Sequence, residues 1–305
     1  EIDPLITGEP GTPPRMAVPD SVALTPDAAE AATMIGQVLW DDLNFEREFY
    51  MLPRDTYNTV PVARSVDQVP FDAWRELGAD AVMFGTVSRS GNEVRVEARL
   101  FNVRARKSVF AKEYTGSASN ARLYAHTISD EVHQQQRGLR GVARTKLAFS
   151  SDRNREKLTG TVENRDTKEI YIADYDGANQ RRITVNRQLN ITPVWSPDAR
   201  GIAYTSYRRG FPDIYVAMIY QGTQETPTNA RGQNWLPSYS PDGSRIAFTS
   251  NRDGNPALYV VNRDGADARP DRERVRSELP DRPLDGRGEH RARRGLEDGD
   301  ALAQR

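Results

Sequence analysis

The segment Trp195–Tyr204 reads WSPDARGIAY, and the segment Tyr239–Phe248, 44 positions later, reads YSPDGSRIAF. A sequence that repeats at a fixed period of 20–50 residues is typical of repeat architectures, in which each copy is one structural unit. An aliphatic-tyrosine pair keeps the same period of 44 over three copies, at Ile170-Tyr171, Ile214-Tyr215 and Leu258-Tyr259. The second half of the chain therefore contains about three copies of one unit.

Each unit reads as short antiparallel strands separated by turn residues. After the Ser-Pro-Asp segment comes an apolar strand, Ile202–Ser206 or Ile246–Ser250, and after a second turn another strand, Ile214–Met218 or Leu258–Asn262. Proline presets the backbone for a turn, and aspartate bonds to nearby amides, so Ser-Pro-Asp favours a hairpin. Short strands at a period of 40–45 residues predict the four-stranded blades of a β-propeller.

The Ser-Pro-Asp serines are also candidate nucleophiles. Ser196 or Ser240 would need a base nearby, but the histidines, His126, His133 and His290, all lie outside the repeats. The sequence has no Gly-x-Ser-x-Gly elbow, no phosphate-binding glycine loop and no dinucleotide fingerprint. We therefore interpret the serines as turn residues and expect no enzyme activity and no cofactor. The alternative is the propeller domain of an enzyme, such as a serine peptidase, whose catalytic domain is missing from this chain.

The first half of the chain predicts a small α/β domain. Thr25 is a candidate helix cap with Pro26 in the first turn, and the helix that follows carries an apolar stripe of Ala28, Ala31, Ala32, Ile35, Val38 and Leu39. A short helix over 71–77 and a longer one over about 121–136 accompany expected strands at 16–22, 49–52, 81–87, 94–100 and 108–114. Their order favours helices packed on a mixed sheet.

Composition excludes several classes of function. The 305 residues hold 42 basic and 43 acidic side chains and no cysteine, so neither nucleic-acid binding nor thiol chemistry is expected. No apolar run reaches the roughly 18 residues that a membrane span needs. The opening at Glu1 fits a mature protein whose signal peptide has been removed.

Two patterns resemble metal sites. His126 and His133 lie seven apart and share a helix face, but no third ligand is evident, so we expect packing and a hydrogen bond from His126 across the domain junction. Asp174–Gly177 resembles a calcium loop that lacks its glutamate, which favours a hairpin turn. We therefore predict no metal.

Aromatic residues in the repeats are candidates for a carbohydrate platform. Trp195 and Tyr239 occupy equivalent repeat positions, which favours packing between blades, whereas Trp235 is expected on a loop and is the better candidate for binding. Tyr207 belongs to the same set.

Several segments resemble the TolB family. ELGADAVMFGTV (Glu76–Val87) and LYAHTISDEVHQQQRGLRGVAR (Leu123–Arg144), which leads into TKLAFSSDR and IYIADYDGANQ, match that family's pattern ahead of the repeats. The likeness covers about residues 16–269. It implies a periplasmic, non-enzymatic protein of the Tol-Pal envelope system with a six-bladed propeller, which supports outer-membrane integrity and constriction at cell division.

The resemblance also implies partners. The N-terminal arm would contact a TolA-like inner-membrane protein, and the propeller would bind a Pal-like peptidoglycan-associated lipoprotein. By position, the loops that lead into each blade would face Pal: Gln188, Leu189 and Asn190 in one copy, and Gln233, Asn234 and Trp235 in the next.

The repeat stops near residue 270. The next Ser-Pro-Asp-Gly is expected at residue 284, where the chain reads LDGR, and residues 270–305 contain nine arginines, nine acidic residues and no aromatic residue. We interpret this stretch as a natural disordered tail or as the product of a frame error in high-GC DNA.

The predicted organisation is a flexible arm (1–15), an α/β domain (16–142), about three blades (143–269) and this tail (270–305). Since open blades leave sheet faces uncovered, we expect a truncated propeller that aggregates or needs further blades.

Overall fold

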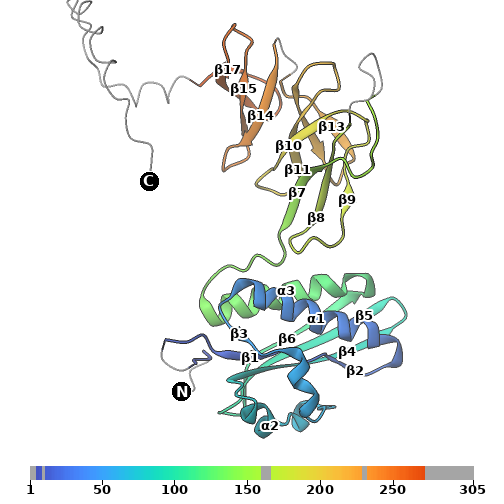
Figure 1. Cartoon of the computed structure of the whole chain (residues 1–305), viewed down its shortest axis with the longest axis vertical. Coiled ribbons are helices and arrows are strands. Elements are labelled where there is room, and N and C mark those ends of the chain that lie inside the picture. The colour runs from blue at the N-terminus through green and yellow to red at the C-terminus, as the bar shows by residue number, and fades with distance from the viewer. Residues whose placement is uncertain (1–4, 9–10, 159–165, 229–231, 272–305) are drawn as a thin grey trace, which may run out of the picture. The chain divides into compact units, whose positions relative to one another are not determined.

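The computed structural model describes residues 5–8, 11–158, 166–228 and 232–271 (Figure 1). They form two compact units, each treated separately below. One contains the α/β domain together with the first sheet of the repeat region, and the other contains the two following sheets. The contact pattern thus joins the first sheet to the α/β domain, although the sequence placed a domain boundary at 142.

The α/β domain is built on a mixed sheet with the order β3-β1-β4-β5-β6, and β2 pairs with β4. The short strands β1, β2 and β3 run parallel to their neighbours, whereas β4, β5 and β6 form an antiparallel meander. The expected strand at 16–22 is divided in two around Pro19, which has no amide hydrogen to donate to a sheet. The strands are β1 (Arg15–Ala17), β2 (Val22–Ala23), β3 (Tyr50–Met51), β4 (Ala81–Ser90), β5 (Glu93–Asn102) and β6 (Lys107–Ser117).

Helices cover both faces of this sheet. In Figure 1, α1 (Ala29–Glu46) and α3 (Ala121–Arg137) lie side by side on one face, and α2 (Phe71–Glu76) lies on the other. The predicted apolar stripe of α1 is confirmed, because its members line the core under α1 and α3. The short 3₁₀-helices are η1 (Pro26–Ala28), η2 (Arg54–Thr59), η3 (Val66–Gln68) and η4 (Ala118–Asn120).

Thr25 does not cap the helix with its side chain. Its hydroxyl instead accepts a hydrogen bond from the Arg89 amide at 3.1 Å, so this threonine ties the helix start to β4.

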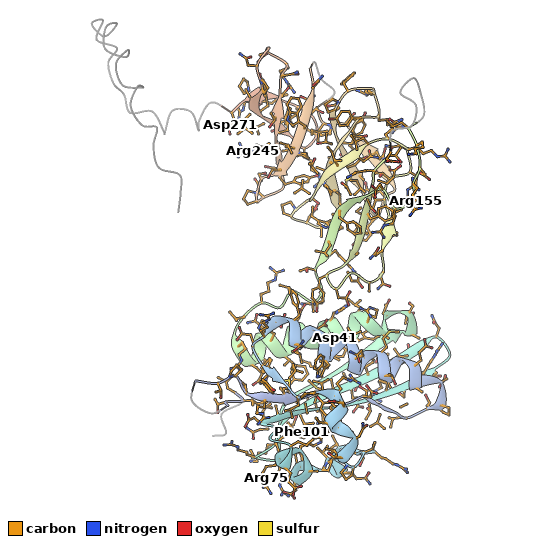
Figure 2. The ribbon with its side chains drawn as sticks, viewed as in Figure 1. Asp41, Arg75, Phe101, Arg155, Arg245 and Asp271 are labelled. Carbon is orange, nitrogen blue, oxygen red and sulfur yellow. The ribbon has the colours of Figure 1, made fainter. Side chains whose placement is uncertain are left out.

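Two apolar clusters hold the domain together. The larger lies under α1 and α3, and the smaller lies on the α2 side, where it includes Trp74 and Phe101. Phe101 is labelled in Figure 2. Ile6 belongs to the larger cluster with no exposed surface, and its amide donates to Gln136 Oε1 at 2.9 Å. The expectation of a flexible arm is therefore wrong for Ile6, whose apolar side chain is removed from water.

Two buried acid–histidine pairs connect α1 to α3. His126 Nδ1 lies 2.8 Å from Asp42 Oδ2, and His133 Nδ1 lies 2.9 Å from Glu46 Oε2. The two histidines therefore do not form a shared site, because each contacts a different acid. The hydrogen bond expected from His126 is made to Asp42 of α1, within the α/β domain. Burial raises the pKa of Glu46 to about 7 and lowers the pKa of His133, so both shifts favour the uncharged form of that pair.

Asp130 on α3 fixes the segment that leaves the α/β domain. Its carboxylate accepts from the Ala143 amide at 2.8 Å and from Arg144 Nε at 2.7 Å. A side chain at Gly141 would collide with the same aspartate, because a Cβ there would lie 2.3 Å from Asp130 Oδ1. Asp130 thus holds the segment that connects the α/β domain to the repeats.

The repeats form three antiparallel sheets, which confirms the predicted partial propeller. Asp174–Gly177 makes the turn from β8 into β9, with Gly177 at a φ of 83°, as expected for a hairpin. The first sheet has β7 (Lys146–Ser151), β8 (Glu169–Asp174) and β9 (Arg181–Arg182). The second has β10 (Asn190–Trp195), β11 (Gly201–Ser206), β12 (Asp213–Met218) and β13 (Thr223–Glu225). The third has β14 (Asn234–Tyr239), β15 (Arg245–Ser250), β16 (Ala257–Asn262) and β17 (Arg269–Pro270). The prediction of a disordered tail or a frame error concerns residues 272–305, which lie outside the described residues.

Equivalent positions in the second and third sheets differ in burial. Ile214 on β12 is fully buried, in a cluster shared with Ile246 and Phe248 of the third sheet. Leu258, its counterpart 44 residues later on β16, is 38% exposed. Ala203, Thr205 and Val216 are likewise fully buried, whereas Ala247, Thr249 and Val260 are half-buried. A blade face is thus buried where a neighbouring sheet covers it.

This comparison predicts different costs for the same truncation at two equivalent positions. We expect Ile214→Ala to lower the free energy of unfolding by about 2–5 kcal/mol, because it leaves a cavity between two sheets. We expect Leu258→Ala to cost about 1 kcal/mol or less, since that side chain already contacts water. Urea unfolding of both variants measures the difference, and equal costs would contradict the role assigned to the neighbouring sheet.

The Glu46–His133 pair predicts a pH dependence of stability. A raised carboxyl pKa means that the folded protein holds this proton more tightly than the unfolded chain. The stabilisation is therefore complete below the ordinary pKa of 4.5 and is lost as the pH rises through about 7. Glu46→Gln, which cannot ionise, should gain stability relative to the native chain at pH 8 but not at pH 5. Urea unfolding at both pH values measures this, and a pH-independent difference would refute it.

Candidate functional site

The Ser-Pro-Asp segments are structural turns. Ser196 Oγ donates to Asp198 Oδ1 at 2.5 Å and accepts from the Gly201 amide at 2.9 Å, and Ser240 and Asp242 repeat the first of these bonds. Bonds from Ser196 and the Arg200 amide lower the pKa of Asp198 to about 2, and those from Ser240 and Ser244 do the same for Asp242. The serine hydroxyls are thus engaged inside the turns, as the sequence predicted.

The segments proposed to face a partner lie at the opposite end of the sheets from these turns. Asn190 pairs with Ser206 at the start of β10, and Asn234 pairs with Ser250 at the start of β14. We call this the asparagine end. The loops 207–212 and 251–256 belong to it as well, because each joins the ends of the two central strands of a sheet.

The two asparagines themselves are fully buried. Asn190 Nδ2 donates to the Lys168 carbonyl at 3.0 Å and to Asn186 Oδ1 at 2.8 Å. Asn234 Nδ2 donates to Asp213 Oδ1 at 2.9 Å. Buried amides with these bonds position the backbone, so the candidates for contact with a partner are their neighbours.

A repeated polar connection underlies the asparagine end. Thr228 donates its hydroxyl to the buried Asp213 carboxylate, and Thr184 does the same to Glu169 in the preceding copy. These pairs and the asparagines recur at the period of 44, which is the signal that would have found them in the sequence.

A β-bulge follows each asparagine. The pairing register shifts between Ile191 and Val194 in β10 and between Trp235 and Ser238 in β14. Within these bulges Thr192 and Leu236 have φ values of 53° and 59°, which side chains other than glycine rarely adopt.

The bulge in β14 presents an apolar side chain to solvent. The Leu236 amide donates to Thr205 Oγ1 at 3.1 Å, which fixes the bulge against β11, while its side chain is 55% exposed. A strained backbone that holds an exposed leucine is a candidate contact point, although the sequence had not singled out this residue.

The other predicted contact residues differ in how far they are exposed to solvent. Gln233 is exposed, whereas Gln188 and Leu189 are half-buried, and the Leu189 carbonyl accepts from the Tyr207 amide. Trp235 is half-buried within β14, so its expected placement on a loop is wrong. The candidate contact residues at the third sheet are thus Gln233, the exposed part of Trp235 and Leu236.

The remaining aromatic candidates are partly covered. Tyr239 packs against the cluster between the second and third sheets, and burial raises its pKa to about 12. Trp195, at the equivalent position, and Tyr207 are both half-buried. The position of Tyr239 therefore agrees with the predicted packing between blades.

Comparisons with known proteins agree with this architecture. The model of the TolB amino-terminal domain matches residues 5–109, and that of the TolB beta propeller domain matches residues 133–272. The chain is 34% identical over 201 residues to the Tol-Pal system protein TolB of Desulfosudis oleivorans, covering 65% of this chain and 43% of that protein. It is 36% identical over 174 residues to that of Geobacter sulfurreducens, covering 57% and 38%.

A solved structure shows the same fold. The crystal structure of TolB from Acinetobacter baumannii matches 86% of this chain and 61% of its own, with a TM-score of 0.69 and 24% identity. In the described part of the chain, every helix is too short or too polar to cross a bilayer. The chain spans less than half the length of the two curated relatives above. It belongs to the TolB family, as an amino-terminal domain followed by part of a propeller.

Proposed function

We propose that this protein is a non-enzymatic, periplasmic scaffold of the Tol-Pal system that supports outer-membrane integrity and constriction during division. The family assignment supports this, since the curated relatives carry the Tol-Pal system name. The engagement of the Ser-Pro-Asp hydroxyls inside turns also favours contact with proteins over catalysis.

The asparagine end is the proposed binding surface for a Pal-like lipoprotein. The observation that carries this proposal is the exposed Leu236, held at a positive φ beside Gln233 and Trp235. Apolar anchors rimmed by polar groups are typical of the residues that dominate protein interfaces. The buried Asn234 and Asp213 fix the bulge before a partner arrives, so little ordering entropy is lost on binding.

The N-terminal arm is the proposed contact for a TolA-like protein. Since Ile6 is buried in the α/β core, a partner that takes this part of the arm must replace that contact. Exposing an isoleucine side chain costs about 1.5–3 kcal/mol. The arm is thus proposed to exchange between its own domain and TolA.

The Pal proposal predicts a local loss of affinity. Leu236→Asn removes the apolar side chain at a position where asparagine tolerates the positive φ. We expect this variant and Trp235→Ala each to weaken binding to the Pal protein of the same organism by about tenfold or more, measured by isothermal titration calorimetry.

The matched control is Tyr220→Ala. Tyr220 is 81% exposed on the turn between β12 and β13, at the end that carries the Ser-Pro-Asp turns. We expect this variant to bind Pal normally. Unchanged binding in both test variants, with melting curves like that of the native chain, would reject the surface.

A further inference from the structure

A turn of the first sheet meets the two long helices in a buried polar cluster. Asp174, Tyr175 and Asp176 lie at the turn after β8, while Asp42 belongs to α1 and His126 to α3. The Tyr175 hydroxyl donates to Asp42 Oδ1 at 2.5 Å. Asp42 Oδ2 lies 2.8 Å from His126 Nδ1, and Asp42 and His126 are 1% and 3% exposed. All of these residues belong to one compact unit.

Asp42 engages one nitrogen of His126 and leaves the other without a partner. The Tyr175 hydroxyl donates to one oxygen of the Asp42 carboxylate, and the other oxygen is the partner of His126 Nδ1 and orients the ring. Nε2, on the other side of the ring, has no hydrogen-bond partner among the described residues.

The free nitrogen faces two more carboxylates. Nε2 lies 4.0 Å from Asp174 Oδ2 and 4.0 Å from Asp176 Oδ2. A ring nitrogen and carboxylate oxygens that face one another without a hydrogen bond are ligand types that a divalent cation such as Zn²⁺ binds. Zn²⁺ binds imidazole nitrogen and carboxylate oxygen at about 2.0–2.2 Å, so tetrahedral coordination needs a contraction of about 0.6 Å in these separations.

We propose that His126 Nε2, Asp174 and Asp176 bind a divalent transition-metal ion of the zinc class. Asp42 is the orienting carboxylate, because a ligand histidine usually donates its other ring N–H to such a group. Asn179 Nδ2 donates to Asp174 Oδ2 at 2.7 Å and supports that ligand in the same way. The ion connects α3 to the β8–β9 turn. This inference is independent of the proposed partner surface.

The charges around the cluster favour exchange of a cation. Lys146 pairs with Asp174, and Arg122 pairs with Asp176, so two positive groups face the three carboxylates of this cluster. The Lys146 side chain is 50% exposed and can turn into water, whereas Arg122 is 26% exposed. A divalent ion that displaces Lys146 makes the local charge neutral.

Sequence reasoning had found no third ligand because the ligands come from separate elements. The His126–His133 spacing concerns a single helix, whereas the carboxylates lie in the β8–β9 turn, about 50 residues further along the chain. The Asp174–Gly177 segment was predicted to be a hairpin turn, and its resemblance to a calcium loop does not indicate a ligand on another element. Neither the histidine spacing nor the Asp174–Gly177 pattern by itself indicates a site whose residues are brought together only by folding.

Titration of the metal-free chain with Co²⁺ and Zn²⁺ tests the proposal. We expect one Co²⁺ per chain, with the visible absorption of a tetrahedral ion, displaced by Zn²⁺. His126→Asn should abolish the spectrum, and Asp42→Asn should weaken the affinity by about 10–100-fold. Lys146→Met should tighten binding, since it removes the competing cation.

The matched control is His133→Asn, which changes a buried histidine on the same helix that pairs with Glu46 instead. It should leave the Co²⁺ spectrum and affinity unchanged, with the fold of each variant checked by melting curves without metal. Lys146→Met keeps the test decisive if His126→Asn fails to fold. It changes a half-exposed side chain, and it is expected to increase the affinity for Co²⁺.

Two results would overturn the inference. One is the absence of a tetrahedral Co²⁺ spectrum in the native chain and in Lys146→Met. The other is a spectrum that survives in folded His126→Asn. A stability change with pH that depends on His126, without metal binding, would assign a proton rather than a metal to Nε2.

Discussion

A propeller sheet has two faces and must cover them with neighbouring sheets. The second and third sheets of this protein show the constraint at equivalent positions, because Ile214 is fully buried where Leu258 is 38% exposed. The residue types are alike, so the neighbour determines the burial. Apolar contact of this kind, added sheet by sheet, is the main stabilising term in repeat folds.

The same repeat assigns different roles to the two ends of each sheet. At one end, Ser196 and Asp198 close a compact turn with their own hydrogen bonds. At the other, the buried Asp213 and Asn234 hold a bulge whose Leu236 side chain reaches solvent. A rigid scaffold that carries a strained, exposed segment is a common basis for recognition.

Local patterns allowed much of the fold to be predicted. The spacing of 44 and the Ser-Pro-Asp turns predicted the antiparallel sheets, and the apolar stripe predicted α1, because both signals depend on neighbours in sequence. Contacts between distant segments were not predicted: Thr25 bonds to Arg89 instead of capping its helix, and Ile6 packs into a core formed by much later residues.

Only part of the candidate site could be predicted, because the rest also depends on contacts between distant segments. Position in the repeat led to Gln233 and Trp235, but the bulge at Leu236 depends on cross-strand register, which the sequence does not display. Asn190 and Asn234 were expected to face a partner because of their position in the repeat. Their burial depends on carbonyl and carboxylate groups brought to them by folding.

The central claim is that partner recognition belongs to the asparagine end of the sheets. Hydrogen–deuterium exchange of the chain with and without the Pal protein of the same organism tests it most directly. The account predicts slower exchange in residues 207–212, 233–236 and 251–256 in the complex, with the Ser-Pro-Asp turns at 196–200 and 240–244 unchanged. Protection confined to those turns would contradict it.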